Sequence, residues 1–171
     1  MKRITIGLLL GAALFSAIAC SNQQSANTEQ GKVGKKENKN ENIIFPKGER
    51  APAENFTGTV YVQPLAPKTE NNNFSIGSVT FEPGARSNWH IHPAGQTLLV
   101  LEGTGLYQEK GKAIRTINKG ETILCDPDIE HWHGASPESG MTHVAITNFK
   151  GDSQVNWLKP VTDEEYKADA R

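Results

Sequence analysis

The sequence predicts a single all-β domain, an antiparallel sandwich or barrel that ends in a short C-terminal helix. The chain is 171 residues long, which is enough for one domain of ordinary size. Short runs of β-type residues recur about every ten residues, and glycine, proline and asparagine separate them. The sequence contains no long helical pattern and no internal repeat. Strands at this spacing are typical of sandwiches and barrels.

Each predicted strand is a short β-type run that ends at a turn signal. The runs occupy residues 57–65, 74–84, 96–103, 104–111, 113–120, 121–127, 142–149 and 154–161. Only residues 161–170 are predicted to be helical. Thr162 is the expected N-cap, and Glu165 follows three positions later, as in a capping box.

The first residues, Met1–Ala19, have the composition of a secretory signal peptide. Lys2 and Arg3 precede an uncharged stretch that is shorter than the ~20 apolar residues needed to span a bilayer. Small residues mark a cleavage site directly before Cys20, an order that resembles a bacterial lipoprotein signal. Such signals usually have leucine where this chain has Ala17, which leaves ordinary secretion open. We therefore expect lipidation of Cys20 and a bacterial cell-envelope location, either lipid-anchored or periplasmic and secreted.

The folded domain is expected to span residues 45–171, after a signal peptide at 1–19 and a lipidated cysteine with a polar tether at 20–44. Within Ser21–Asn42 only two residues are aliphatic, so this segment buries too little apolar surface to offset its ordering entropy. If the first cysteine carries lipid, Cys125 has no disulfide partner. The domain must then be held together by its core.

The five histidines form three short clusters, and none of them lies on the tether or the tail. They are His90, His92, His131, His133 and His143. Residues two apart on a strand share a face, ~6.6 Å apart, so the two imidazoles of a His-x-His pair can reach one ion at ~2.0–2.1 Å. Gln96 opens the next predicted strand after a tight turn, which returns its side chain to the same point. With a third imidazole from His131 or His133, this pattern predicts a metal site.

At these residues the chain resembles the cupin family. The first cupin motif runs glycine, five residues, His-x-His, three or four residues, glutamate, six residues, glycine. This chain matches every interval, with Gly84, His90, His92, Gln96 and Gly103, and differs only in having glutamine at the glutamate position. The resemblance implies the cupin fold, a double-stranded β-helix or jelly-roll-like barrel.

The second cupin motif is partly degraded. Gly120 and His131 keep the expected span of eleven positions between glycine and histidine. Asp128 stands where a glycine is usual, and Ala135 replaces the asparagine of the motif. Together the two motifs imply four metal ligands, which are His90, His92, Gln96 and His131.

Residues 81–105, 131–146 and 163–166 resemble a narrower group of small bacterial cupins. This group includes the manganese-dependent hydroxynitrile lyases and the cupins associated with carboxymuconolactone decarboxylases. Three neutral imidazoles and the amide of Gln96 would leave a divalent ion its full charge of +2, whereas a glutamate would reduce the charge to +1. The full charge makes a better Lewis acid towards a substrate oxygen. One divalent transition metal per chain is expected, Mn²⁺ first, with Fe²⁺, Zn²⁺ or Ni²⁺ as alternatives.

In that group the histidine that matches His143 is the one implicated in catalysis, so the resemblance implies a general base or acid beside the metal. His133 lies on the ligand side of its strand and is expected to be a proton-relay partner, or else a hydrogen-bonded residue at the barrel mouth. If His143 faces the cavity, Thr147 on the same strand does too. Gly77 and Val79 on an earlier strand would line the same cavity and leave room for an aromatic or short aliphatic ligand.

The leading functional hypothesis is a metal-dependent enzyme of the hydroxynitrile-lyase type. It would break a C–C bond in a small carbonyl or hydroxy compound, with the substrate oxygen on the metal. One alternative is a Mn- or Fe-dependent oxygenase, which would consume O₂. Another is a non-catalytic envelope module that binds a ligand or a metal. We also expect a homo-oligomer, a dimer or tetramer, and membrane contact only through the lipid anchor. A net charge of −1 argues against a nucleic-acid partner.

Overall fold

A computed structural model of the chain describes residues 44–167. The expected signal peptide, Cys20 and the expected tether up to residue 43 lie outside the described residues. Within residues 44–167 no helix is long and apolar enough to cross a membrane.

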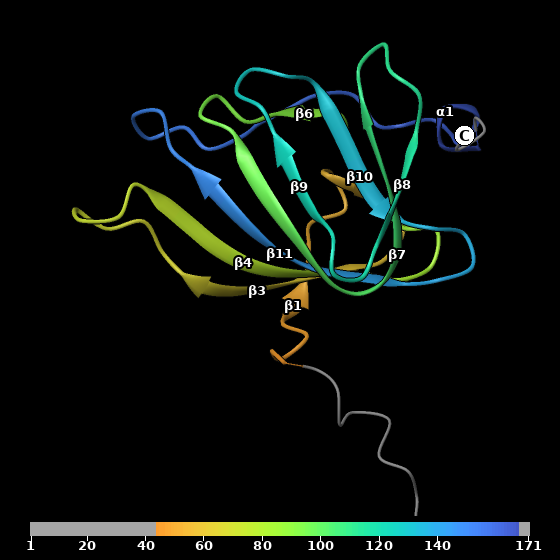
Figure 1. Ribbon diagram of the computed structural model, residues 1–171, viewed down its shortest axis with the longest axis horizontal. Coiled ribbons are helices and arrows are strands. Elements are labelled where there is room, and N and C mark those ends of the chain that lie inside the picture. Colours follow the sequence, from red (N-terminus) through yellow and green to blue (C-terminus); the bar gives the residue numbers. More distant parts are fainter. Residues whose placement is uncertain (1–43, 168–171) are drawn as a thin grey trace, which may run out of the picture. The chain divides into compact units, whose positions relative to one another are not determined.

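Strands form most of the regular structure in residues 44–167, and one short helix follows them. They are β1 (Glu49–Arg50), β2 (Phe56–Thr57), β3 (Val60–Ala66), β4 (Phe74–Phe81), β5 (Arg86–Ser87), β6 (His90–Ile91), β7 (Gln96–Glu109), β8 (Arg115–Asn118), β9 (Thr122–Cys125), β10 (His131–Ala135), β11 (Met141–Asn148), β12 (Asn156–Trp157) and α1 (Asp163–Lys167). The main path through the antiparallel sheet is β1-β3-β4-β11-β7-β10-β5-β2. Figure 1 shows this sheet curling into a half-barrel, with β3, β4 and β11 below and β6 and β10 above. The predicted all-β fold with a short C-terminal helix is confirmed.

Strand β7 connects the two halves of the sheet. The sequence predicted separate strands at 96–103 and 104–111, and this is wrong, because the structure has one strand of 14 residues. Its first part pairs with β11 and β9, and its second part pairs with β10 and β8. Gly103 lies where the partners change. Its φ is 75°, and a Cβ there would collide with the carbonyl oxygen of Gly140, so glycine lets the strand continue where another residue would interrupt it.

The short strands around the histidines differ from the sequence prediction. Strands β5, β6 and β10 were not among the predicted runs, although β6 begins at His90 and β10 at His131. These two histidines face each other as Cα partners in the ladder. The strand predicted at 154–161 is reduced to the two residues of β12, which pair with β6. Such short pairings depend on contacts between distant segments, which a local residue pattern does not record.

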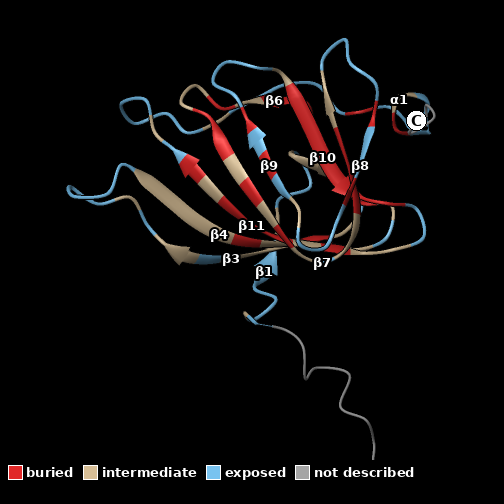
Figure 2. Ribbon diagram, in the orientation of Figure 1, coloured by how far each residue is buried: buried red, intermediate tan, exposed pale blue. Residues whose placement is uncertain are grey.

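Two groups of buried side chains form the core. Figure 2 colours the buried positions along the ribbon in red. The larger group includes Leu98 and Val100, which alternate along β7 with less buried residues. It also contains Cys125, a free thiol that is 2% exposed. The smaller group packs under α1 and comprises Trp89, Leu106, Ile114, Trp132, Val161 and Tyr166.

The C-terminal helix begins with the predicted capping box, which is confirmed. The Glu165 backbone N–H donates to the Thr162 hydroxyl at 3.1 Å, and the Thr162 backbone N–H donates to the Glu165 carboxylate at 2.9 Å. The buried guanidinium of Arg86 donates to the Asp163 carboxylate at 2.7 Å. Tyr166 donates its hydroxyl proton to the last carbonyl of β10 at 2.7 Å. The Tyr166 bond fixes the helix to β10, the strand that carries His131, and the Arg86 bond fixes it to β5.

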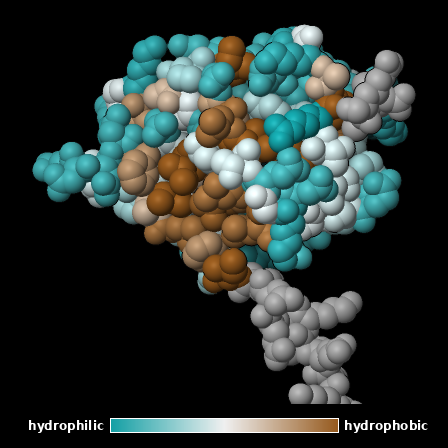
Figure 3. Space-filling model, in the orientation of Figure 1, coloured by the Kyte–Doolittle hydropathy of each residue, from teal (hydrophilic) through white to brown (hydrophobic). Residues whose placement is uncertain are grey.

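Hydrophobic residues also gather on the outer face of the sheet, over β4, β11 and β9 (Figure 3). Strand alternation explains them, because the neighbours of cavity-facing residues point outward. Ile146 of β11 lies opposite Thr97 of β7, and Thr97 lies opposite Leu124, which is 68% exposed.

Candidate metal centre

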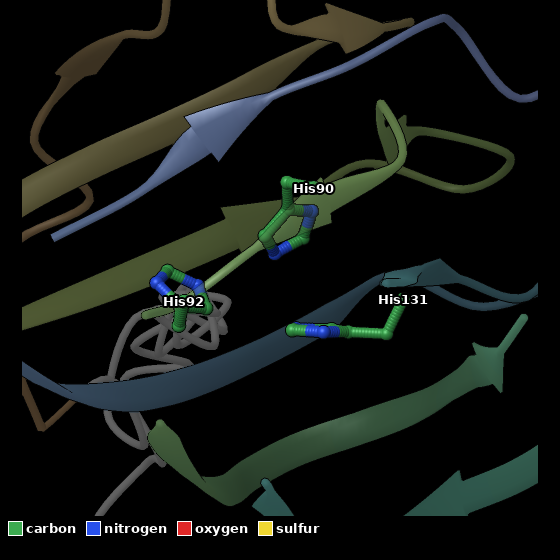
Figure 4. Close-up of side chains that lie close together, drawn as sticks. All are labelled: His90, His92 and His131. Carbon is green, nitrogen blue, oxygen red and sulfur yellow. The ribbon is translucent and has the colours of Figure 1, made fainter. Parts of the chain in front are cut away.

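Three histidines from two strand segments converge on one point. His90 lies in β6, His92 follows it in the turn before β7, and His131 opens β10. One ring nitrogen from each lies within 4.8 Å of the other two. The ring centroids are 4.3, 5.0 and 5.5 Å apart. Figure 4 shows His90 and His92 on one segment and His131 on the neighbouring one, with the rings approaching a shared space.

A backbone carbonyl orients each of these three rings. In every case Nδ1–H donates to the carbonyl, at 2.6 to 2.9 Å. The pairs are His90 with Asn88, His131 with Ile129, and His92 with Gln154. These bonds fix the tautomer, so that Nε2 is the nitrogen with a free lone pair. In the part of the chain that the structure describes, Nε2 of His92 and of His131 has no hydrogen-bonding partner.

Gln96 provides an oxygen donor in addition to these imidazole nitrogens. It is the first residue of β7 and lies directly opposite Thr147 of β11. Its amide Nε2 donates to the Thr147 hydroxyl at 2.8 Å. Its carbonyl Oε1 is buried and, within residues 44–167, has no partner. The amide also lies close enough to His92 to affect the pKa of that imidazole.

These four donors fit a divalent transition metal. Imidazole nitrogen and amide oxygen both coordinate such ions, whereas a buried polar atom without a partner is destabilising. The orphaned atoms of His92, His131 and Gln96 belong to side chains that lie together. None of the described residues that line the adjoining cavity is an aspartate or glutamate. A bound ion would therefore keep its charge of +2.

The other two histidines lie beside this group, so all five imidazoles share one site. The ring centroid of His133 is 5.3 Å from that of His90 and 4.9 Å from that of His143. His143, in β11, stacks on Phe81 at 5.8 Å and is fully buried. Both ring nitrogens of His143, and Nδ1 of His133, lack a hydrogen-bonding partner among the described residues. The sequence left the third imidazole open, and the structure groups His131 with the His-x-His pair and places His133 beside His143.

Burial favours the neutral form of all five imidazoles. Loss of solvation lowers the pKa of His92 and the pKa of His143 to about 4 each. Burial and the neighbouring imidazoles hold the pKa of His90 and of His133 well below the ordinary value. Burial also lowers the pKa of His131, although a backbone hydrogen bond partly opposes it. Neutral imidazole is the form that coordinates a metal or accepts a proton.

A cavity of about 680 Å³ opens beside the histidines, and four of the five line it. The structure places Gly77, Val79 and Thr147, the residues expected to line a cavity, along its wall. Sequence reasoning did not identify Phe56 and Trp157, which also line it. Their ring centroids are 5.4 Å apart in an edge-to-face arrangement. Phe56 comes from β2, which was not among the predicted runs, and Trp157 comes from β12, the part of the strand predicted at 154–161 that forms.

The metal-free protein is expected to lose stability in mild acid. Its folded state holds neutral histidines, whereas unfolding releases imidazoles with a pKa of about 6.5. The unfolded state therefore binds more protons below pH ~6.5, and the free energy of unfolding falls as the pH drops towards the folded pKa of about 4. At about 1.4 kcal/mol per pKa unit, His143 alone accounts for roughly 3 kcal/mol at the acid end.

Thermal melts of the metal-free protein from pH 8 to pH 4 measure this effect. The melting temperature should stay level above pH ~7 and fall steeply between ~6.5 and ~5, above the range in which most carboxylates titrate. A His143→Leu variant should show a shallower fall, because one buried imidazole is gone. Equal slopes for the two proteins would show that His143 does not stay neutral on folding.

Comparison with known proteins agrees with this arrangement. Residues 77–146 match the family model described as a cupin domain. An (R)-mandelonitrile lyase from Granulicella tundricola is 45% identical over 118 residues, which are 69% of this chain and 90% of that protein. The crystal structure of a cupin-like protein from Thermotoga maritima is 43% identical, with a TM-score of 0.70, over 74% of this chain and 96% of that one.

A cupin-2 domain from Rhodospirillum rubrum shares the fold at a TM-score of 0.54 and 15% identity, over 69% of this chain and 75% of that one. The cupin fold that the two histidine motifs predicted is thus confirmed. On its sequence and on its fold, this chain belongs to the cupin family.

Proposed function

We propose that this protein is a metal-dependent lyase that cleaves the C–C bond of a small hydroxynitrile, or forms it in reverse. The observation that carries this proposal is a neutral four-donor set beside His143, a buried imidazole with no partner among the described residues. The cavity next to them is largely lined by apolar side chains. The 45% identity to an (R)-mandelonitrile lyase supports this class of reaction.

In this proposal His90, His92, Gln96 and His131 hold one divalent transition ion, with Mn²⁺ as the first candidate and Fe²⁺, Zn²⁺ or Ni²⁺ as alternatives. When bound, the ion supplies Lewis-acid polarisation of a substrate oxygen. The chain adds no negative charge of its own, because the imidazoles are neutral and the amide cannot ionise. The carbonyl partners of the Nδ1 atoms keep the rings in place as the substrate enters and leaves.

His143 is the residue that we assign to proton transfer. A neutral ring nitrogen of His143 takes the proton of the substrate hydroxyl, and the O–H electron pair forms the new carbonyl bond. The C–C electron pair leaves with cyanide, which then receives the proton from the imidazolium, so the products are a carbonyl compound and HCN. Burial assists the second transfer, because an imidazole with a pKa of about 4 releases its proton readily. His133, at 4.9 Å between ring centroids, is the proposed relay partner.

The part of the cavity wall beside His143 leaves room for the organic part of the substrate. In the β4–β11 ladder Val79 lies opposite His143, and Gly77 lies opposite Ala145. These small side chains leave space beside the imidazole, and Phe56 and Trp157 line the same cavity, with the Trp157 ring centroid 5.0 Å from that of His90. Aromatic groups pack well on such surfaces. We therefore propose an aryl or short aliphatic hydroxynitrile as the substrate.

We also propose a cell-envelope location, which rests on the sequence of Met1–Ala19 and on Cys20 alone. The mature protein should fractionate with membranes through its lipid. A Cys20→Ser chain should move to the soluble envelope fraction when cells are fractionated and blotted. If both proteins fractionate alike, lipidation is not the anchor.

Removal of a ligand should abolish metal retention. In His92→Ala or His131→Ala only three protein ligands remain to coordinate the ion. Purified protein should therefore contain far less than one metal per chain. Elemental analysis after gel filtration measures this. His143→Ala is the matched control, because it also deletes a buried imidazole but should keep its metal. Stoichiometric metal in either ligand variant would contradict the assignment.

Loss of the proton-transfer residue should remove activity and spare the metal. His143→Ala should cleave mandelonitrile about 10²–10⁴-fold more slowly than the unaltered chain, because general acid–base catalysis contributes about that factor. Benzaldehyde release, followed with and without oxygen, measures the rate. Full activity in the metal-loaded variant would rule out this mechanism. Turnover that requires and consumes oxygen would favour the oxygenase instead, and tight ligand binding without turnover would favour the binding module.

A further inference from the structure

We infer that Thr147 is a positioning residue of the metal centre, whose hydroxyl holds the amide of Gln96 with its oxygen free to coordinate. This inference rests on the metal site proposed above. Nothing in the two histidine motifs points to Thr147, because it lies on β11, beyond both of them. Its link to the site is a cross-strand pair that forms only in the folded sheet.

A glutamine at a ligand position has a difficulty that a glutamate lacks. Both ends of a carboxylate are acceptors, so either oxygen can face an ion. An amide has one acceptor end and one donor end, and a half-turn of the group exchanges them. When the oxygen of Gln96 faces the ion, its NH₂ group is buried on the other side and needs an acceptor.

Thr147 supplies that acceptor. It lies directly opposite Gln96 in the β7–β11 ladder, and its Oγ1 accepts a hydrogen bond from Nε2 at 2.8 Å. Gln96 is 8% exposed and Thr147 is 7% exposed, so little water can replace this bond. Within residues 44–167 it is the one side-chain hydrogen bond of the Gln96 amide, and Oε1 is left without a partner.

Loss of this hydroxyl would oppose metal binding in two ways. With the oxygen on the ion, the NH₂ group would be buried and unsatisfied, which is destabilising. Without the ion, the amide would be free to turn and donate to the orphaned Nε2 of His92, which would stabilise the metal-free form. The hydrogen bond should also strengthen when the ion binds, because a cation on the oxygen makes the N–H a better donor.

Calorimetric titration of the metal-free protein with Mn²⁺, and in parallel with Zn²⁺, tests the inference. Thr147→Val keeps the shape of the side chain and removes the acceptor, and the dissociation constant should rise about 10- to 100-fold, as for other residues that orient metal ligands. Thr147→Ser keeps the hydroxyl and should bind close to wild type. Thr142→Val is the matched control, because its hydroxyl contacts Thr80 at 3.1 Å, away from the donors.

A double-mutant cycle shows whether Thr147 acts through the amide. In a Gln96→Ala background there is no amide to hold, so adding Thr147→Val should not weaken binding further. An equal weakening in both backgrounds would overturn the inference, because Thr147 would then act through packing. Wild-type affinity in Thr147→Val would overturn it and leave the metal centre intact. If the wild-type chain binds neither ion, the metal centre itself fails, and the role of Thr147 fails with it.

Discussion

The polar nitrogens of five imidazoles lie together inside one half-barrel, and burial removes the water that would otherwise satisfy them. In His90, His92 and His131 one ring nitrogen is satisfied, because Nδ1 donates to a backbone carbonyl. The lone pairs on the Nε2 atoms of these rings are directed towards one shared space. The same burial keeps every ring neutral, so the site can receive a cation without first losing protons. Ring orientation, low pKa and the capacity for a metal therefore have a common physical origin.

The fold meets this constraint by bringing together segments that are distant in the chain. Strand β7 is central, because it begins with Gln96 and pairs with β11 in its first part and with β10 in its second. It therefore sets the distance between His131 on β10, a proposed ligand, and His143 on β11. Gly103 allows this, since a strand broken at that point would leave the two halves free to shift. The separation between the proposed Lewis-acid site and the proposed proton acceptor is thus built into one continuous strand.

Much of this site was predictable, and the remainder has a physical reason for being hidden. The His-x-His spacing and the strand period place His90 and His92 together from local sequence alone, and the capping box at Thr162 is equally local. The continuity of β7 was missed, because Gly103 signals a turn and only its ladder partners show otherwise. The Gln154 carbonyl on His92 is a bond between residues far apart in the chain. No residue type encodes a backbone acceptor, so a sequence pattern cannot reveal it.

The proposed chemistry requires that three imidazoles and the amide of Gln96 hold an ion while the imidazole of His143 stays uncoordinated. Anomalous diffraction from crystals grown with Mn²⁺ tests that requirement most directly. One peak per chain is predicted within coordination distance of Nε2 of His90, His92 and His131 and of Oε1 of Gln96, with His143 uncoordinated. A peak shared by His133 and His143, or no peak in a chain that is folded and saturated with Mn²⁺, would contradict it.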